Sequence, residues 1–483
     1  MLTLILLAVL PYLAAAQSSS SCGPAPSGSI RPSIASGYTY QVVATGLSDP
    51  RGLAFDLNGH LLVVESGRGR ISAHRLNTDS NGCVSVTDST DVTPDGLDLN
   101  HGIAVSKDSR TLYASNAGEA YSWEYNPDAR TVNNRRTLVQ NMTGSDHSTR
   151  TLELSRSAPG ILIISFGSQS NYDALSVNID TGSASVKAFN LTDLTSDQPY
   201  TYQTDGVLLG WGLRNEVGVA EHPTTGGIWG VENSADQMIR YGVDIHANNP
   251  AEELNFLGNI SEMVSSDPNI GYQGPNYGYP WCFSAWDTAD LPQNSGIEVG
   301  NQFAISPVDA LGNRNQTDEF CANRTAARLV FQSHMAPLDI KFNNSASEAW
   351  IAFHGSWNSP DPVGYKMSYV RFNEQGEPVE PSTSTTAAID IFANQDNSRC
   401  PGDCFRPATM AIDWLGRIFM SSDSSGEIYM VRRVEGSSGT TPGPPSTTGG
   451  SGSTPSPTGG VARVVPGWCL VAALSLAAVM AGM

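Results

Sequence analysis

Histidine and arginine residues stand at or just before the start of six short apolar segments of this chain. An imidazole can accept a proton near neutral pH. A guanidinium group keeps its positive charge and binds carboxylates or developing oxyanions through paired N–H donors. Brought to one place, such residues would form a cationic site for an anionic ligand. The six are Arg51 in PRGLAF, His101 in NHGIAV, His147 in DHSTRTLEL, Arg214 in LRNEVGVA, His334 in HMAPLDIKF and Arg406 in FRPATMAID.

A second apolar segment follows each of the first ones. These second segments read LLVVES, TLYASNAG, ILIISFGS, GIWGVENS, AWIAFHGS and RIFMSSDS. Pairs of short strands that recur at roughly 40–70 residues are typical of propeller blades. Because the innermost strand of every blade begins at the same mouth of the central channel, the six polar residues should form one ring. The sequence therefore predicts an all-β fold, a six-bladed β-propeller, with a cationic mouth in a chain of formal net charge −20.

Three parts of the predicted ring could do chemistry. His147 is the sharpest candidate for a general base, and the alternative is a loop histidine held only by hydrogen bonds. Arg214 and Asn215 offer a cationic fork beside an amide, suited to a carboxylate or an oxyanion, or else a bridge to a neighbouring blade. Lys366 lies in a Pro- and Gly-rich loop after HGSWN, where a lysine is ordinarily solvated. The aromatic residues of 277–286 predict either a stacking platform for a sugar or loop packing.

The two ends of the chain differ from the predicted propeller domain, which covers residues 17–435. Residues 1–16 are apolar and end in small residues, as in a cleaved signal peptide, so we expect a secreted protein. Residues 436–460 are almost entirely Ser, Thr, Pro and Gly and predict a stalk. Residues 461–483 predict a signal for a glycosylphosphatidylinositol (GPI) anchor, with a retained membrane helix as the alternative. N-glycosylation sequons agree with secretion and lie at Asn141, Asn190, Asn259, Asn315, Asn323 and Asn343.

The cysteines predict a disulfide framework. Of seven cysteines, Cys469 lies in the tail that anchor attachment would remove. The other six can pair in about 15 ways, and an even number in an oxidising compartment predicts three disulfides. A metal site in the CPGDC loop just before Arg406 is the alternative for the last pair. Adjacency along the chain favours Cys22–Cys83, Cys282–Cys321 and Cys400–Cys404.

Several classes of function are disfavoured. The chain has no GxSxG elbow, Walker loop, HExxH motif or dinucleotide-binding glycine fingerprint. Nicotinamide, ATP and zinc-protease chemistry are therefore not expected. The acidic balance of charge also disfavours nucleic acid or an anionic lipid surface as a partner.

Taken together, the motifs resemble the soluble quinoprotein glucose/sorbosone dehydrogenases, and most closely the fungal pyrroloquinoline-quinone-dependent pyranose dehydrogenases. The resemblance extends through most of residues 40–433, and the order and spacing of the motifs are more specific than any single motif. It implies a six-bladed propeller that holds pyrroloquinoline quinone (PQQ) with Ca²⁺ at the channel mouth and oxidises an aldose or a ketoaldose. The motifs are DHSTRTL at 146–152, GLRNEVG at 212–218, NYGYPWC at 276–282, HMAPLDIKF at 334–342, AFHGSWN at 352–358 with GYK at 364–366, and FRPATMAI at 405–412.

The resemblance also implies roles for individual residues. His147 matches the general base that removes the proton of the sugar's anomeric hydroxyl while hydride passes to the quinone. Arg214 matches the arginine that polarises the accepting quinone carbonyl, and Asn215 matches its neighbouring contact. The other implied cofactor contacts are Lys366 and Arg406 at carboxylate-binding positions, and Asn100, His101 and His334 at strand starts.

The segment VENSAD matches the calcium loop of that family and implies backbone carbonyl ligands from Asn233 and Ser234. This loop lacks the Gly-Pro of the bacterial members. Ser168, in FGSQS, stands where those members have an aspartate that supports the base. With no haem domain or cellulose-binding module in the sequence, the electrons are expected to pass to an external acceptor, a copper monooxygenase or a diffusible quinone.

Two other classes of function remain open. A calcium-dependent lactonase on a similar propeller would be a hydrolase, but its metal needs several acidic or amide side chains, whereas the strand starts here are mainly Arg or His. A surface propeller that only binds glycans or proteins is the second alternative, because a fold does not fix a function. It predicts that His147→Ala changes no activity.

Overall fold

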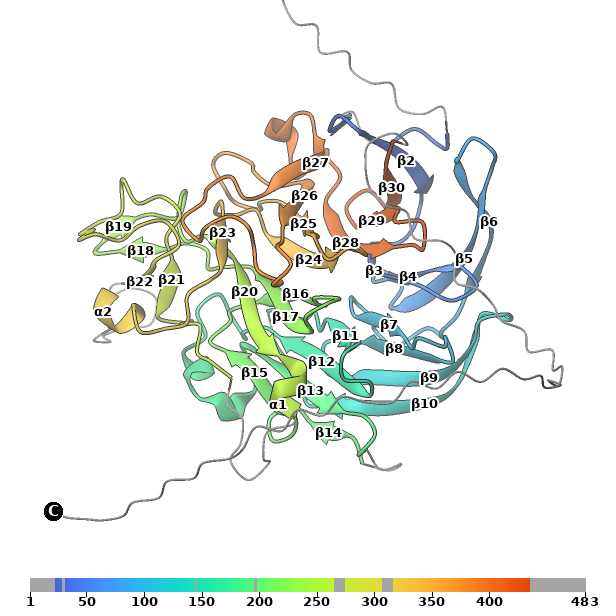
Figure 1. The fold of residues 1–483 in the computed structure, drawn as a ribbon, viewed down its shortest axis with the longest axis horizontal. Coiled ribbons are helices and arrows are strands. Elements are labelled where there is room, and N and C mark those ends of the chain that lie inside the picture. The colour runs from blue at the N-terminus through green and yellow to red at the C-terminus, as the bar shows by residue number, and fades with distance from the viewer. Residues whose placement is uncertain are drawn as a thin grey trace, which may run out of the picture. The chain divides into compact units, whose positions relative to one another are not determined.

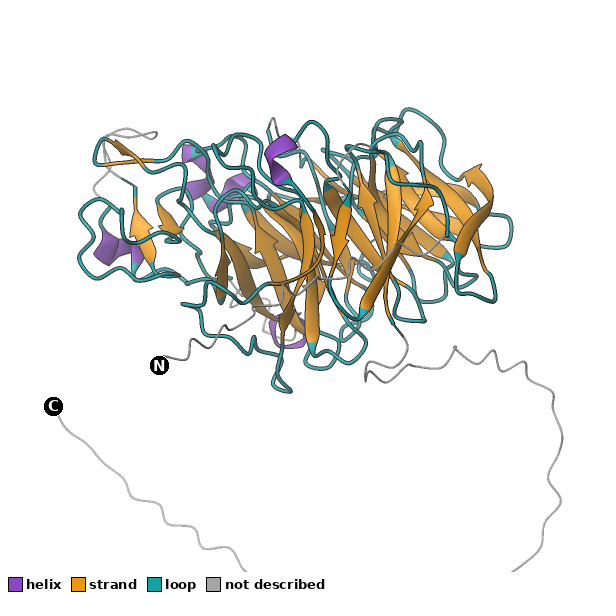
Figure 2. Ribbon diagram, turned by 90° about the horizontal axis from the view of Figure 1, so that it is seen from above, coloured by secondary structure: helices purple, strands orange, loops and turns teal. Residues whose placement is uncertain are grey.

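The structure is a computed structural model that describes residues 22–27, 31–142, 144, 146–194, 198–264, 274–305 and 316–434. The predicted signal peptide (1–16), stalk (436–460) and anchor signal (461–483) lie outside these residues. Strands dominate the described part, and Figure 2 shows how few helices accompany them. No helix there is long and apolar enough to cross a membrane. The helical elements are α1 (Ile260–Val264), α2 (Asp318–Cys321), η1 (Ala174–Val177), η2 (Ile179–Thr181) and η3 (Asn397–Arg399).

Six sheets form the blades, which confirms the predicted six-bladed propeller (Figure 1). Blade one comprises β3 (Pro50–Phe55), β4 (Leu61–Glu65), β5 (Arg70–Thr78) and β6 (Val84–Asp91). Blade two comprises β7 (Ile103–Val105), β8 (Thr111–Ser115), β9 (Ala120–Asn126), β10 (Thr131–Gln140) and β14 (Tyr200–Thr201). Blade three comprises β11 (Leu152–Leu154), β12 (Ile161–Phe166), β13 (Ser185–Asn190) and β15 (Val207–Trp211).

The remaining blades include strands from both ends of the described chain. Blade four comprises β16 (Glu216–Glu221), β17 (Gly227–Glu232), β20 (Glu252–Asn259) and β23 (Leu329–Phe331). Blade five comprises β24 (Pro337–Phe342), β25 (Glu348–Phe353), β26 (Lys366–Arg371), β27 (Ile389–Asn394) and β1 (Pro32–Ile34). Blade six comprises β28 (Pro407–Ile412), β29 (Ile418–Ser422), β30 (Glu427–Arg433) and β2 (Tyr38–Ala44). Two small hairpins are β18 (Ile239–Arg240) with β19 (Val243–Asp244), and β21 (Cys282–Ser284) with β22 (Gln302–Ala304).

Apolar side chains between neighbouring blades form the core. Strands such as β4 and β12 are buried along their whole length, because each sheet packs against another sheet on both faces. One cluster joins Leu62 and Val64 of blade one to Leu112 and Trp123 of blade two. The core is therefore a series of layers between blades, and the polar residues at the strand ends are left to the channel mouth.

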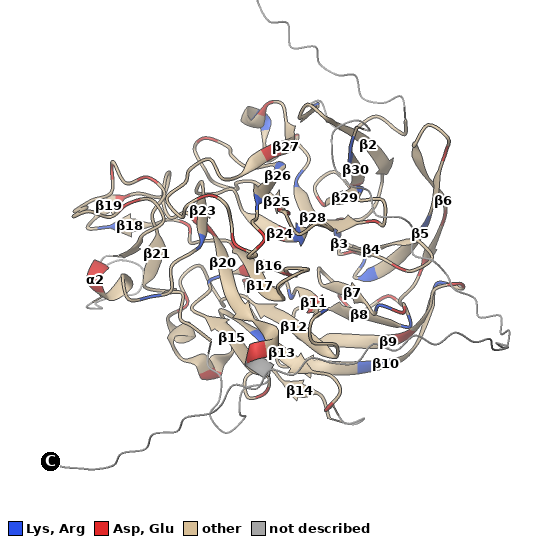
Figure 3. Ribbon diagram, in the orientation of Figure 1, with Lys and Arg blue, Asp and Glu red and all other residues tan. Residues whose placement is uncertain are grey.

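Glycines bring the inner strands close together at the channel. A Cβ atom on Gly52 would lie 2.0 Å from the carbonyl oxygen of His101, and one on Gly102 would lie 2.1 Å from that of Arg150. These glycines directly follow Arg51 and His101, so close contact between blades at these points requires their lack of a side chain. Figure 3 shows lysine and arginine positions gathered where the inner strands β3, β24 and β28 converge.

The antiparallel pairing within each blade brings a second set of residues to the same mouth. The first residue of β3, Pro50, pairs with Glu65 at the end of β4, and Pro407 at the start of β28 pairs with Ser422 at the end of β29. Residues that follow the second strand of a blade therefore lie beside residues that precede its first strand.

The three favoured disulfides are confirmed: Cys22 with Cys83, Cys282 with Cys321, and Cys400 with Cys404. The last one closes the CPGDC loop directly before Phe405 and Arg406.

Candidate active site

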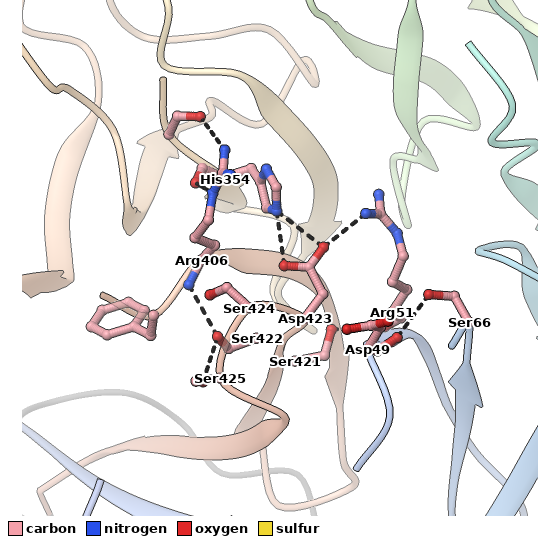
Figure 4. Close-up of polar contacts among 12 residues, drawn as sticks. Asp49, Arg51, Ser66, His354, Arg406, Ser421, Ser422, Asp423, Ser424 and Ser425 are labelled. Carbon is pink, nitrogen blue, oxygen red and sulfur yellow. Dashed lines mark hydrogen bonds and ion pairs between the residues drawn. The ribbon is translucent and has the colours of Figure 1, made fainter. Parts of the chain in front are cut away.

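Five charged or titratable residues at the mouth form what we call the Arg406 cluster: Arg51, His101, His354, Arg406 and Asp423. Figure 4 labels all of them except His101. Asp423 lies at its centre, with one carboxylate oxygen 2.8 Å from Arg51 Nη1 and the other 2.9 Å from His354 Nε2. Arg51 Nε also lies 3.3 Å from His101 Nδ1. The cluster thus connects blades one, two, five and six.

Burial and charge set the protonation states of this cluster. Burial alone would raise the pKa of Asp423, but His354 and Arg51 override it and hold that pKa well below its ordinary value. Burial lowers the pKa of His354 to about 4, although Asp423 opposes the shift. Burial, followed by the charge of Arg51, lowers the pKa of His101 well below its ordinary value. At neutral pH both imidazoles are neutral, and the two arginines outnumber the one carboxylate.

Arg406 is held by backbone carbonyl groups. Its Nε donates to the carbonyl oxygen of His354 over 3.1 Å, and its Nη2 donates to that of Gly355 over 2.8 Å. The guanidinium carbon also lies 4.4 Å from the centre of the Trp357 ring and 5.7 Å from that of Tyr365. Neutral groups therefore fix this cation in place.

Arg214 is fixed in the same way on the side of the mouth formed by blades three and four. It is only 5% exposed. Its Nε and Nη2 donate to the backbone and side-chain oxygens of Asn171 over 3.1 and 2.9 Å, and its Nη1 donates to the carbonyl oxygen of Asn233 over 3.1 Å. Within the described residues, the hydrogen bonds that the structure gives the Arg214 and Arg406 side chains go to neutral oxygens, and neither arginine forms an ion pair.

His147 lies beside Arg214, and its tautomer follows from its contacts. Its Nδ1 is 2.9 Å from the carbonyl oxygen of Ser168 and 3.0 Å from Ser168 Oγ. A carbonyl oxygen can only accept a hydrogen bond, and Ser168 Oγ donates its own proton to the Ser170 carbonyl over 2.7 Å. Nδ1 must therefore carry the proton, so the lone pair of the neutral ring is on Nε2.

The same surroundings keep His147 neutral. Burial is the main cause, and the positive charge of Arg214 is the second, of a pKa lowered to about 3. Gly167 allows the close packing here, because a Cβ atom on it would lie 2.7 Å from His147 Cβ and 2.5 Å from Asn215 Oδ1. Asn215 and His147 therefore both pack against Gly167 and are neighbours in the site.

The pKa of His334 shifts in the opposite direction to that of His147. Its Nδ1 lies 3.4 Å from Asp236 Oδ1, and its Nε2 lies 2.5 Å from the carbonyl oxygen of His246. Burial alone would lower the pKa of His334, but these two acceptors raise it above the ordinary value. The pKa of Asp236 shifts downward: burial alone would raise it, but His334 and Arg214 lower it below its ordinary value.

The predicted calcium loop has partly suitable geometry. The carbonyl oxygen of Asn233 accepts from Arg214, and its second lone pair is available to a cation. The backbone N–H of Ser234 donates to Glu252 Oε2 over 2.8 Å, so an acidic side chain braces the loop. Asp236 lies two residues further on, so oxygen donors of the kind that Ca²⁺ prefers adjoin the predicted ligands along the chain.

Two other predicted cofactor contacts, Lys366 and Asn100, have different surroundings. Lys366, at the start of β26, pairs with Asp390 on the neighbouring strand β27 over 2.9 Å. Asn100 donates to the carbonyl oxygen of Ser148 over 3.0 Å, next to His147. A polar cavity of about 510 Å³ opens beside Asn100. The structure therefore brings Asn100 to the base and engages Lys366 in an ion pair with the outer strand.

The aromatic segment 277–286 is loop packing in its central part. Tyr277, Tyr279 and Phe283 are at most 3% exposed. The hydroxyl of Tyr279 accepts from the backbone N–H of Asp173 over 2.6 Å, which ties the segment to the loop that carries Ser168. These rings are not available to stack on a sugar.

Sequence reasoning missed four residues that this geometry brings into the site, and it found Ser168 only through the family resemblance. All five follow the second strand of a blade, in the segments FGSQSN, VENSAD, AFHGS and SSDS, and antiparallel pairing brings these segments to the mouth. A search for polar residues after the second strand, as well as before the first, would have found them. The four are Asn171, Asp236, His354 and Asp423.

Comparisons with known proteins find similar proteins along most of the chain, and these comparisons agree with one another. Residues 32–434 match the family model described as TrAA12-like. A pyrroloquinoline quinone-dependent sugar dehydrogenase of Hypocrea jecorina is 44% identical over 407 residues, covering 83% of this chain and 89% of that protein. A pyrroloquinoline quinone-dependent pyranose dehydrogenase of Coprinopsis cinerea is 36% identical over 432 residues, covering 86% of this chain and 56% of that protein.

Two solved structures are similar along the same part of the chain. The calcium structure of the Trichoderma reesei Carbohydrate-Active Enzymes family AA12 protein has a TM-score of 0.80 at 41% identity, covering 86% of this chain and all of that one. The holo form of the PQQ domain of Coprinopsis cinerea pyranose dehydrogenase has a TM-score of 0.77 at 35% identity, with the same coverage. The match to the family model and the length and identity of these alignments place the chain in the TrAA12-like family.

Proposed function

We propose that this protein is a PQQ-dependent sugar dehydrogenase that oxidises an aldose or a ketoaldose, with His147 as the general base. The observation that carries the proposal is the pair of contacts from His147 Nδ1 to Ser168, which leaves an unprotonated Nε2 next to Arg214. The names of the two relatives described above support the cofactor and the substrate class.

His147 would take the proton of the sugar's anomeric hydroxyl on Nε2. Because the ring is neutral at pH 7, it can accept a proton without first losing one. Loss of that proton from the hydroxyl oxygen, and of hydride from the carbon that bears this oxygen, converts the C–O bond to C=O, so a cyclic aldose yields a lactone. A positioned base of this kind contributes about 10²–10⁴-fold to a rate.

PQQ fits the cationic side of the mouth. It carries three carboxylates, and Arg214 and Arg406 are two buried guanidinium groups whose hydrogen bonds go to neutral oxygens. Arg214 would also face the quinone carbonyl that gains negative charge, as an oxyanion-stabilising donor. When bound, PQQ supplies the two-electron acceptor for the hydride. The further proposed contacts are Asn100, His101, Asn215, His334 and Lys366.

Calcium, location and electron acceptor complete the proposal. The carbonyl oxygens of Asn233 and Ser234 would hold Ca²⁺ at the mouth. The apolar start and the Ser/Thr-rich end of the sequence support secretion and attachment to the cell surface through a GPI anchor. An external acceptor, either a copper monooxygenase or a diffusible quinone, would take the electrons onward.

The test combines binding and turnover. The purified protein is titrated with PQQ in the presence of Ca²⁺ by calorimetry, and dye reduction is then measured with a panel of aldoses. We expect PQQ binding and sugar-dependent reduction, both retained in Asp146→Asn and with reduction lost in His147→Gln. Asp146 is the matched control because it adjoins the base but is exposed. No PQQ binding, with hydrolysis of a lactone instead, would overturn the proposal in favour of a lactonase.

A further inference from the structure

Trp357 is unusual among the apolar side chains of the described residues. It is 73% exposed, more than any other large hydrophobic side chain there, and no other large apolar residue of its loop is exposed. Tryptophan side chains are largely buried on average. The exposed ring therefore requires a reason that the packing of the chain does not supply.

The loop that carries Trp357 is held firmly in place. The backbone N–H of Ser356 donates to the carbonyl oxygen of Val363 over 3.0 Å, and that of Val363 donates to Ser356 Oγ over 3.2 Å. Tyr365, which is fully buried, lies under the loop and also bonds Ser356. Gly355 is required here because a Cβ atom on it would lie 2.2 Å from the Tyr365 ring. The exposed ring is therefore presented by a closed and anchored loop.

One face of the Trp357 ring is already occupied, and the other is open. The guanidinium group of Arg406 lies over one face, 4.4 Å from the ring centre. Arg406 is in turn fixed by the carbonyl oxygens of His354 and Gly355, at the mouth of the channel. The exposed area of Trp357 therefore faces away from Arg406, at the rim of the candidate active site.

We propose that the open face of Trp357 is a stacking platform for a pyranose ring of the sugar substrate, and so a determinant of substrate affinity. The inference rests on the proposed function, because it names the residue that holds the sugar of that reaction. A pyranose presents a flat C–H face, which stacks on an aromatic ring while the sugar hydroxyls stay in water. The neutral sugar also avoids repulsion by the chain's formal charge of −20.

The surroundings favour a small neutral ligand over a docked protein. A stable protein interface buries about 800 Å² on each partner. Around Trp357 the loop offers Asn358, Ser359 and Asp361, and no second exposed large apolar side chain. A single ring of this kind matches one sugar ring in size.

The test compares Trp357→Ala and Trp357→Phe with Trp414→Ala. Trp414 is the matched control, since it is 41% exposed but follows β28, at the end of that strand away from Arg406. We expect Trp357→Ala to raise the KM for sugar about 2- to 12-fold, the factor for losing one stacked ring. The kcat should stay within about twofold, and Trp357→Phe should keep most of the affinity.

A second measurement does not depend on turnover. D-Glucose is titrated into the wild-type protein, Trp357→Phe and Trp414→Ala while tryptophan fluorescence is recorded. The sugar-dependent change should be lost in Trp357→Phe and kept in Trp414→Ala. This measurement decides the inference even if the wild-type protein reduces no dye, which would contradict the proposed function alone.

Three results would overturn the inference. The first is an unchanged KM for sugar together with an unchanged fluorescence response in the Trp357 variants. The second is a higher KM for the electron acceptor alone, which would make the ring a docking point for the acceptor. The third is weaker PQQ binding at constant sugar affinity, which would make Trp357 only a clamp on Arg406.

Discussion

The contacts of His147 predict different effects for two neighbouring substitutions. Replacing His147 by Gln removes the base, so kcat/KM should fall by about 10²–10⁴-fold. Replacing Ser168 by Ala removes one of the two acceptors of Nδ1 but keeps the carbonyl oxygen at 2.9 Å. A single hydrogen bond contributes about 0.5–1.5 kcal/mol, which is a factor of about 2–12 in rate. The serine hydroxyl should therefore matter far less than the imidazole.

The measurement is kcat/KM for dye reduction by the protein loaded with PQQ and Ca²⁺, across pH. In the wild-type protein, the lowered pKa of His147 places the acidic limb below pH 6.5, with full activity above it. Ser168→Ala should keep this profile because the backbone acceptor still fixes the tautomer. The double variant should be no slower than His147→Gln alone.

The reasoning fails if Ser168→Ala loses as much activity as His147→Gln. That result would mean that the hydroxyl, and not the backbone, orients the base. It also fails if His147→Gln keeps more than a tenth of the wild-type kcat/KM, because another group would then have to accept the proton.

Three further outcomes are expected. Asp423→Asn leaves Arg51 without its carboxylate, so urea denaturation should show a free energy of unfolding lower by about 3 kcal/mol, and an unchanged value would contradict the role given to this pair. The pKa of His354 is about 4 in the folded chain and about 6.5 in the unfolded chain, so between pH 6.5 and 4 mainly the unfolded state gains the proton. The free energy of unfolding should therefore fall by about 3 kcal/mol over this range. His354→Asn should reduce this dependence on pH in denaturation experiments. Chelation of Ca²⁺ by EGTA should weaken PQQ binding in calorimetry if the Ser234 loop holds the ion, and equal affinity with and without EGTA would exclude this.

The fold was predictable because its signals are local. Pairs of apolar strands recur along the chain, and Arg51 and His101 are each followed by a glycine that allows neighbouring blades to approach. The positions of the six inner strands follow from this pattern alone. The outermost strands of blades five and six were not predictable, since β1 and β2 pair with strands more than 350 residues away.

The site was predictable only in part. His147 and Arg214 precede inner strands, so a search for polar residues at strand starts identified them. Asp423 and His354 follow second strands, and their mutual contact spans 69 residues and two blades. The pairing of Lys366 with Asp390 depends on strand register at the outer part of blade five, which residue type does not reveal. Local pattern predicts which residues reach the mouth, and tertiary packing decides which of them meet.

The pairing of β2 with β30 has a consequence for how the protein is built and handled. Tyr38 lies opposite Arg433, so β2 begins beside the end of β30. During synthesis, β2 has no partner until nearly the whole ring has been made, which predicts slow, late closure. A circular permutant that joins the two ends at this point and opens a loop between other blades should keep the ring intact.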